Sequence, residues 1–170
     1  MSATVASSRP SHPFMFVLAG GLVAGALDIT YACVFWALKA DVPAQRIFQS
    51  VAAGLLGKGS FDGGWSTAGL GLALHFFIAT SMSLTYYLVA RSWPALWRRA
   101  VRSGILYGLL LYGIMNYIVV PLSAAGGGGR KAPVWVGLSI VVHMFLIGLP
   151  IALFTRQAMR ATTASPPATR

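Results

Sequence analysis

The stretch that decides the fold runs from Gly69 to Ala90 and reads GLGLALHFFIATSMSLTYYLVA. It is long enough to cross a bilayer as a helix, because about 20 apolar residues span the hydrocarbon core. One ionisable residue, His75, lies inside it. Ionisable side chains are costly in a membrane and tend to mark functional sites there, so His75 is the first candidate for chemistry.

The same pattern returns at 137–145, which reads GLSIVVHMF. His143 stands six positions after the glycine of its Gly-Leu pair, as His75 does. A second, shorter match is a Gly-x-x motif that ends at Asp28 in an earlier apolar run and at Asn116 in a later one. Together the matches predict a parallel repeat of two helices, related by a pseudo-two-fold axis along the membrane normal.

The composition excludes a soluble domain. Of the 170 residues 56% are hydrophobic and 9% are charged, and the mean hydropathy is +0.71, whereas a soluble domain carries about 25% charged residues. There are three acids, Asp28, Asp41 and Asp62, and the net charge is +10. The basic residues flank apolar runs and form no stripe with interleaved aromatics, so the predicted partner is the lipid bilayer and not nucleic acid.

The apolar runs predict four transmembrane helices at about 14–38, 70–90, 101–121 and 134–155. A signal peptide is the competing reading of the first run, but that run exceeds an h-region of about 7 to 15 residues and contains Asp28. Pro150 predicts a kink near the end of the fourth helix. Residues 1–13 and 156–170 are predicted to be disordered tails of an all-α four-helix membrane domain, and the glycines at 126–129 predict a flexible loop.

A segment at 42–57 differs in kind, because it is too short and too polar to span. Asp41 suits a helix cap, and the apolar residues of the segment recur at helical spacing opposite its polar ones. The apolar set is Ile47, Phe48, Val51 and Leu55, and the polar set is Gln45, Arg46 and Gln49. The pattern predicts an amphipathic helix that is either interfacial or re-entrant. The simpler alternative is an ordinary amphipathic connector that lies on the headgroups.

Orientation follows from the distribution of Lys and Arg. The N-terminal tail, the middle loop and the C-terminal tail carry eight of the thirteen, with a dense cluster from Arg91 to Arg102. Since cytoplasmic segments are enriched in Lys and Arg, both termini are predicted to be cytoplasmic and the 42–57 helix to lie on the outer side. The single cysteine, Cys33, lies within an apolar run, so no intrachain disulfide is possible.

Each predicted span contributes one polar residue to a common depth. At about 1.5 Å per residue, Asp28, His75, Asn116 and His143 all fall within roughly 8 Å of the midplane, on its outer side. Small residues on the same helix faces, such as the GxxxG pair Gly21 and Gly25, would let the backbones approach so that these groups meet.

A packing role is the alternative for each polar residue. A membrane histidine or asparagine often only bridges helices, for about 0.6 kcal/mol. Asp28 is the strongest single candidate, because a carboxylate at the bilayer centre costs about 2.5 to 3.5 kcal/mol. It should therefore be protonated, paired with a histidine or facing water.

The later spans resemble a known family. The residues that carry the resemblance are His75-Phe76, Tyr86-Tyr87, Trp93-Pro94, Gly104, Tyr107-Gly108, Met115-Asn116, Pro121-Leu122 and His143. In this order they resemble the YagU-like family of small bacterial inner-membrane proteins. The resemblance implies a bacterial inner-membrane location and no particular biochemical activity.

The function predicted from the polar residues is permeation or transport of protons or a small solute, with Asp28 titrating and His75 and His143 as relay or ligand groups. One alternative is a b-type haem held by the two histidines, or a divalent metal held by both histidines and Asp28. Another is an accessory or assembly subunit, with homo-oligomerisation possible in either case. The sequence has no nucleophile, phosphate-loop or zincin motif, so no enzyme is expected.

Overall fold

The structure is a computed structural model that describes residues 12–126 and 132–164. These residues form helices and no strand. The elements are α1 (Pro13–Ala40), α2 (Ala44–Leu56), η1 (Gly57–Phe61), α3 (Gly64–Ser92), α4 (Pro94–Arg98), α5 (Ala100–Ile114), η2 (Met115–Val119), α6 (Val120–Leu122), α7 (Pro133–Val142), η3 (His143–Gly148) and α8 (Leu149–Ala164). Here η1 is a 3₁₀ turn, and η2 and η3 are π-helical.

Four of the described helices are long and apolar enough to cross a membrane: Pro13–Ala40, Gly64–Ser92, Ala100–Leu122 and Pro133–Thr163. The third is the continuous helix α5–η2–α6, and the fourth is α7–η3–α8. The predicted all-α membrane bundle is therefore confirmed, and the chain is a multi-pass membrane protein.

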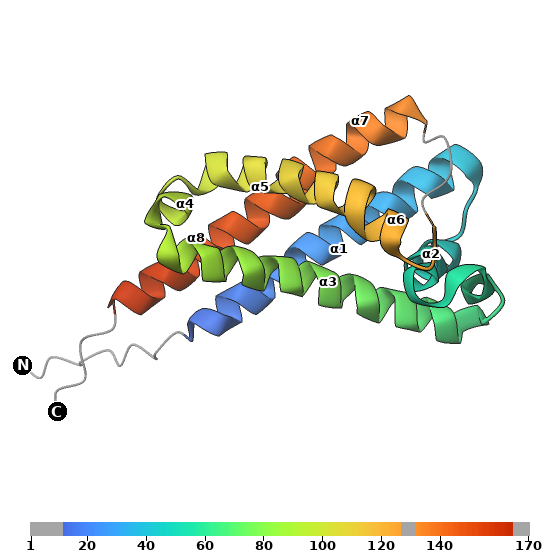
Figure 1. Cartoon of the computed structure of the whole chain (residues 1–170), viewed down its shortest axis with the longest axis horizontal. Coiled ribbons are helices and arrows are strands. Elements are labelled where there is room, and N and C mark those ends of the chain that lie inside the picture. The colour runs from blue at the N-terminus through green and yellow to red at the C-terminus, as the bar shows by residue number, and fades with distance from the viewer. Residues whose placement is uncertain (1–11, 127–131, 165–170) are drawn as a thin grey trace, which may run out of the picture.

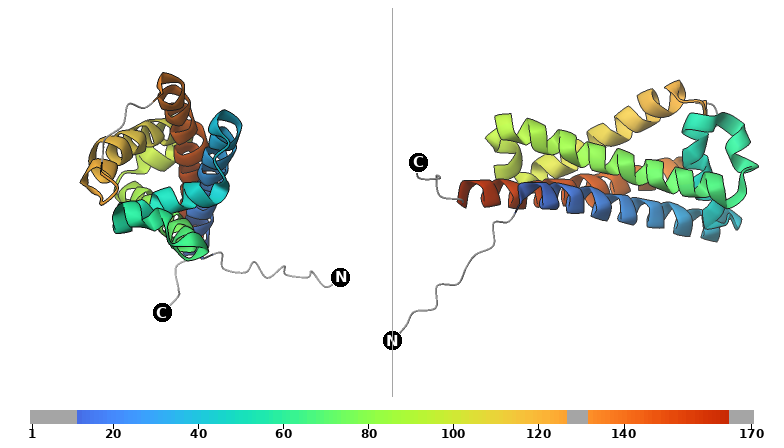
Figure 2. Two further views of the ribbon diagram at one scale, coloured as in Figure 1. Left: turned by 90° about the vertical axis from the view of Figure 1, so that its right-hand side faces the viewer. Right: turned by 90° about the horizontal axis from the view of Figure 1, so that it is seen from below.

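The α7–η3–α8 helix is central to the bundle, because it packs against α1, α3 and α5. The first residues of α1 and the last of α8 lie at the same end as α4, which we call the α4 end (Figure 1). The opposite end carries α2, α6 and the start of α7, and we call it the α2 end (Figures 1 and 2).

The interior is rich in alanine beside a few large residues such as Tyr86, Leu111 and Ile151, and many large apolar side chains cover the outside. Alanines such as Ala24 and Ala52 are fully buried, whereas Phe77 is 69% exposed. This inside-out distribution suits a bundle whose solvent is lipid, since lipid gives no reason to bury leucine and close backbone approach needs small side chains. Hydrogen bonds also join the helices: Ser83 Oγ donates to Val17 O at 2.8 Å in the interior, and the part-buried Tyr107 OH donates to Met82 O at 2.8 Å.

Two spans are longer than the apolar runs suggested. α3 begins at Gly64, and α8 continues to Ala164 because residues after Thr155 are good helix formers that still pack, with Ala158 fully buried. Residues 156–164 are thus helical and not part of a disordered tail. The predicted disorder of 1–11 and 165–170, and most of the predicted glycine loop at 126–129, lies outside the described residues.

Asp41 ends α1, where the sequence suggested a cap for the next helix. It adopts the left-handed conformation (φ 51°), which aspartate tolerates better than most residues. Its N–H donates to Ala37 O at 3.1 Å, and this bond satisfies a carbonyl of the last turn. Pro43 then takes the position before α2.

α2 is docked on α3, and its predicted polar face is wrong at one position. Gln49 is only 2% exposed and donates from Nε2 to Gly64 O at 3.0 Å. Leu55, on the predicted apolar face, is 61% exposed. The reason is that α2 buries small residues: a Cβ on Gly71 of α3 would collide with the carbonyl of Phe48, so glycine is needed at this contact. Whether α2 is interfacial or re-entrant stays a prediction.

Each π-helical segment ends two residues before a proline. η2 precedes Pro121 and η3 precedes Pro150. Proline has no N–H and clashes with the carbonyl four residues earlier, so a wider turn before it relieves the conflict without breaking the helix. A π segment thus precedes Pro150, where a kink was predicted, and the two π segments contain Asn116 and His143.

Candidate functional site

Asp28 and His75 meet between α1 and α3. The Asp28 Oδ2 lies 4.0 Å from His75 Nε2, and the two side chains are 25% and 14% exposed. His75 Nε2 also lies 2.9 Å from the carbonyl oxygen of Gly25. Because a carbonyl only accepts, Nε2 carries a proton, and the other ring nitrogen holds the lone pair of the neutral ring. Two residues of the predicted polar layer are thus in direct electrostatic contact.

The close approach that allows this pair comes from α1 glycines. A Cβ on Gly21 would lie 2.6 Å from Thr80 Cα, and a Cβ on Gly25 would lie 3.0 Å from the Phe76 ring. The predicted GxxxG face therefore packs on α3, and it brings the Gly25 carbonyl within reach of His75.

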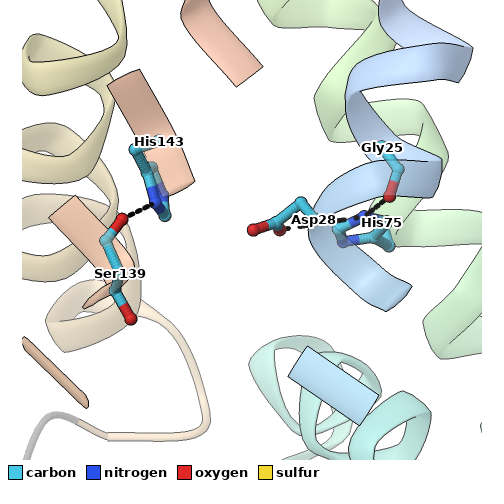
Figure 3. A network of polar contacts seen from close by, with 5 residues as sticks. All are labelled: Gly25, Asp28, His75, Ser139 and His143. Atoms are coloured by element: carbon cyan, nitrogen blue, oxygen red, sulfur yellow. Dashed lines mark hydrogen bonds and ion pairs between the residues drawn. The ribbon is translucent and has the colours of Figure 1, made fainter. Parts of the chain in front are cut away.

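His143 faces the pair from the central helix. The Asp28 carboxylate points from α1 toward the helix that carries His143 (Figure 3). His143 Nδ1 lies 2.8 Å from Ser139 O of the preceding turn and so donates to it. The lone pair of the neutral His143 ring is therefore on Nε2, whereas that of His75 is on Nδ1.

Asn116 belongs to the same region but bonds within its own helix. Its Nδ2 donates to Tyr112 O at 3.0 Å. The Tyr112 ring in turn meets the His143 ring edge-on, with centroids 5.4 Å apart. Asn116 is thus linked to the histidine through Tyr112, and this hydrogen bond to the residue four positions earlier is one that any helix could provide.

The site also contains two hydroxyl groups, those of Tyr31 and Ser139, which the sequence did not predict. Ser139 is 6% exposed; its Oγ and the Tyr31 hydroxyl are both buried and make no hydrogen bond of normal geometry, although the two side chains interact with each other. The signal was helical spacing, since Tyr31 follows Asp28 by one turn and Ser139 precedes His143 by one turn.

We call the region that contains Asp28, His75, His143, Tyr31 and Ser139 the seam. An aromatic cluster closes its α2 end, between α1 and α7. The Tyr31 ring stacks on Trp135 with centroids 5.6 Å apart and planes 12° apart. Phe35 and Trp36 contact Trp135 at centroid distances of 4.8 and 5.2 Å. From the α2 end inward the seam therefore presents aromatic rings, then two hydroxyls, then the carboxylate and imidazoles.

The predicted metal set is not assembled. Within residues 12–126 and 132–164 no three His, Cys, Asp or Glu side chains are grouped so that they could hold a metal ion. His75, His143 and Asp28 thus form an acid flanked by two imidazoles without the convergence that a three-ligand site requires.

The fold and this site define a class, the all-α multi-pass membrane proteins with an ionisable group inside the spans. Comparison of the chain with family models, with curated proteins and with solved structures finds no match.

Proposed function

We propose that this membrane protein conducts protons, or couples them to a small solute, through the seam that contains Asp28, His75 and His143. The observation that carries the proposal is the Asp28–His75 contact of 4.0 Å inside the spans. Within the predicted spans the only Lys or Arg is Arg102, at the α4 end. The partners of Asp28 are therefore imidazoles, which gain and lose protons in the physiological range, and not guanidinium groups, which do not.

The hydrogen bonds assign a proton-accepting atom to each histidine. His75 accepts at Nδ1 because its Nε2–H is held by Gly25 O, and His143 accepts at Nε2 because its Nδ1–H is held by Ser139 O. A proton that arrives on either ring makes an imidazolium, and the Asp28 carboxylate balances this charge without leaving the site. Proton exchange then requires rotation of a ring or a bridging water, and not rearrangement of the fold.

Access from the α2 end runs past the aromatic cluster. Tyr31 and Ser139 lie between that cluster and Asp28, and their hydroxyls can each donate and accept a hydrogen bond. In a hydrocarbon environment such groups favour a water or a polar solute at this level of the seam. The stacked rings cover them, so a solute larger than water needs α1 and α7 to separate.

The lipid compartment and the orientation are part of the proposal. The distribution of Lys and Arg favours cytoplasmic termini and an outward-facing α2 end, and the resemblance to YagU-like proteins favours a bacterial inner membrane. In this orientation the aromatic cluster faces the outside. The proposed role is non-enzymatic, and homo-oligomerisation, the haem alternative and the accessory-subunit alternative stay predictions.

Proton flux into vesicles tests the proposal. The purified chain is reconstituted into liposomes that contain a pH-sensitive dye, and a potassium diffusion potential drives protons inward. We expect flux above that of empty vesicles, and we expect Asp28→Asn to abolish both the flux and its pH dependence. Asp62→Asn is the matched control, because Asp62 is exposed and lies outside the spans.

Two outcomes would overturn the proposal. The first is unchanged flux in Asp28→Asn. The second is a wild-type protein that matches empty vesicles while Asp28→Asn and His75→Leu lower only its thermal stability; that result would assign the polar residues to helix packing.

A further inference from the structure

Four arginines line one hollow at the α4 end. The hollow has a volume of about 390 Å³, and its walls are Arg98, Arg99, Ala100, Val101, Arg102 and Arg156. Arg98 is the last residue of α4, Arg99 is the N-cap of α5, Arg102 lies in the first turn of α5, and Arg156 lies on α8. The hollow therefore combines arginines that are far apart in the sequence. They come together because α4 packs against α8.

Within residues 12–126 and 132–164 no acidic side chain lies at this end of the bundle. The only acids of the protein are Asp28, in the middle of α1, and Asp41 and Asp62, which flank α2 at the other end of the bundle. Guanidinium groups that share a hollow repel one another, and each presents a planar fork that matches a phosphate or carboxylate. No acidic side chain of the described residues is therefore placed to compensate these arginines, and an external anion fits the hollow.

The backbone at the same place adds to the attraction. α5 begins at Ala100, and its N-terminus has no side-chain cap. The N–H groups of the first turn have no partner within the helix, and the helix dipole places partial positive charge at this end. Ala100 and Val101 are among the residues that form the wall, so this helix end opens into the hollow.

The position in the bundle identifies the source of the anion as lipid. The hollow lies where the span Ala100–Leu122 begins, at the depth of the headgroups. Beyond it, on the face of α5 that Arg102 begins, a row of large apolar side chains is exposed at a spacing of four residues, Leu106 at 65% and Leu110 at 56%. A phospholipid can place its phosphate among the arginines and its acyl chains on this row, whereas a free phosphate gains nothing from the row.

We propose that the arginine hollow is a binding site for the phosphate of an anionic phospholipid. The site is independent of the Asp28 seam. It fixes the α4–α5 turn to α8 through the bound headgroup, and it selects anionic over zwitterionic lipid because a choline would add a fifth positive charge.

The test measures lipid binding to the full chain in detergent by native mass spectrometry and by thermal shift. The probes are phosphatidylglycerol, phosphatidylcholine and inorganic phosphate, and the acyl chains of the two lipids are identical. We expect phosphatidylglycerol alone to bind and to raise the unfolding temperature. We expect the double variant Arg99→Gln/Arg102→Gln to weaken that binding roughly tenfold or more.

The matched control is Arg91→Gln/Arg160→Gln, which removes the same charge near the same end but changes no residue of the hollow wall. Its affinity for phosphatidylglycerol should fall by less than about threefold, because this variant removes only diffuse electrostatic attraction. If the glutamine double variant does not fold, Arg99→Lys/Arg102→Lys replaces it: this variant keeps the charge, and it should still weaken binding because lysine lacks the bidentate fork.

Three results would overturn the proposal. They are equal losses in the hollow and control variants, equal binding of both lipids by the wild-type chain, and protection by inorganic phosphate that matches that of phosphatidylglycerol. The first indicates diffuse attraction, the second an unselective surface and the third a soluble anion as the ligand.

Discussion

The helix around His75 and the helix around His143 begin from the same sequence pattern and reach different structures. His75 lies in the unbroken helix α3 and donates across to Gly25 of α1. His143 opens the π segment η3 and donates to Ser139 of its own helix. His75 therefore joins two helices by a hydrogen bond. His143 bonds within its own helix, and that helix packs against α5 through glycines.

The glycines explain the difference. On the first side Gly21 and Gly25 of α1 lie against α3, whereas on the second side Gly104 and Gly108 of α5 lie against Gly148 and the His143 carbonyl. Gly113 occupies the place that corresponds to Gly25 in the proposed repeat, yet a Cβ there would meet nothing within 4 Å. The two halves of the predicted repeat thus use different glycines for helix packing. The two-fold relation stays a prediction.

The largest expected effect is at the second packing site. Gly108→Val places a side chain where the His143 carbonyl already lies, and Gly148 faces the same spot. Since backbone cannot yield as a flexible side chain can, we expect a loss of about 3 kcal/mol or more, or no folded protein. Unfolding by SDS in mixed micelles measures the loss. A near-wild-type Gly108→Val would mean that the helices are not in contact here.

The next effect compares the two glycines that the repeat equates. Gly25→Ala adds a Cβ 3.0 Å from the Phe76 ring and 3.1 Å from Ala79 Cβ, so we expect it to destabilise by about 1 kcal/mol. Gly113→Ala meets open space and should stabilise by about 0.5 to 1 kcal/mol through helix propensity. The same unfolding assay applies to both. Equal effects of the two changes would restore the symmetry that the structure breaks.

The histidines themselves should differ by a smaller amount. His75→Leu removes a bond between helices and leaves Asp28 without its nearest partner, so we expect a loss of about 1 kcal/mol. His143→Leu removes only a bond within one helix and should change the stability by less than about 0.5 kcal/mol. The two single variants are compared at one pH and in one detergent. A reversal of their order would contradict the assigned hydrogen bonds.

The smallest expected effect is the coupling energy between Asp28 and each of the two histidines. Double-mutant cycles that combine Asp28→Asn with His75→Gln or with His143→Gln should each give a coupling of about 0.5 kcal/mol, because the carboxylate contacts His75 and points toward the helix that carries His143. No coupling to His143 would reduce the site to the Asp28–His75 pair. Asp28→Asn with His12→Gln is the null cycle, since His12 is exposed and precedes the first span.

By itself the sequence determined the membrane fold and the residues that need explaining. Apolar runs of span length leave the backbone one way to satisfy its hydrogen bonds in lipid, which is a helix, and this constraint is local. The same constraint singled out Asp28, His75 and His143, because ionisable groups are rare and costly in such runs.

Only the tertiary structure decided how these residues are used. Which glycine touches which helix selected Gly25 O as the partner of His75, and the seam between α1 and α7 added Tyr31 and Ser139, which look ordinary in the sequence. Gln49 was misplaced for the same reason, since its partners Gly64 and Thr67 lie on another helix. Helix periodicity fixes a residue's angle about its own axis, and the position of the neighbouring helix decides what that angle faces.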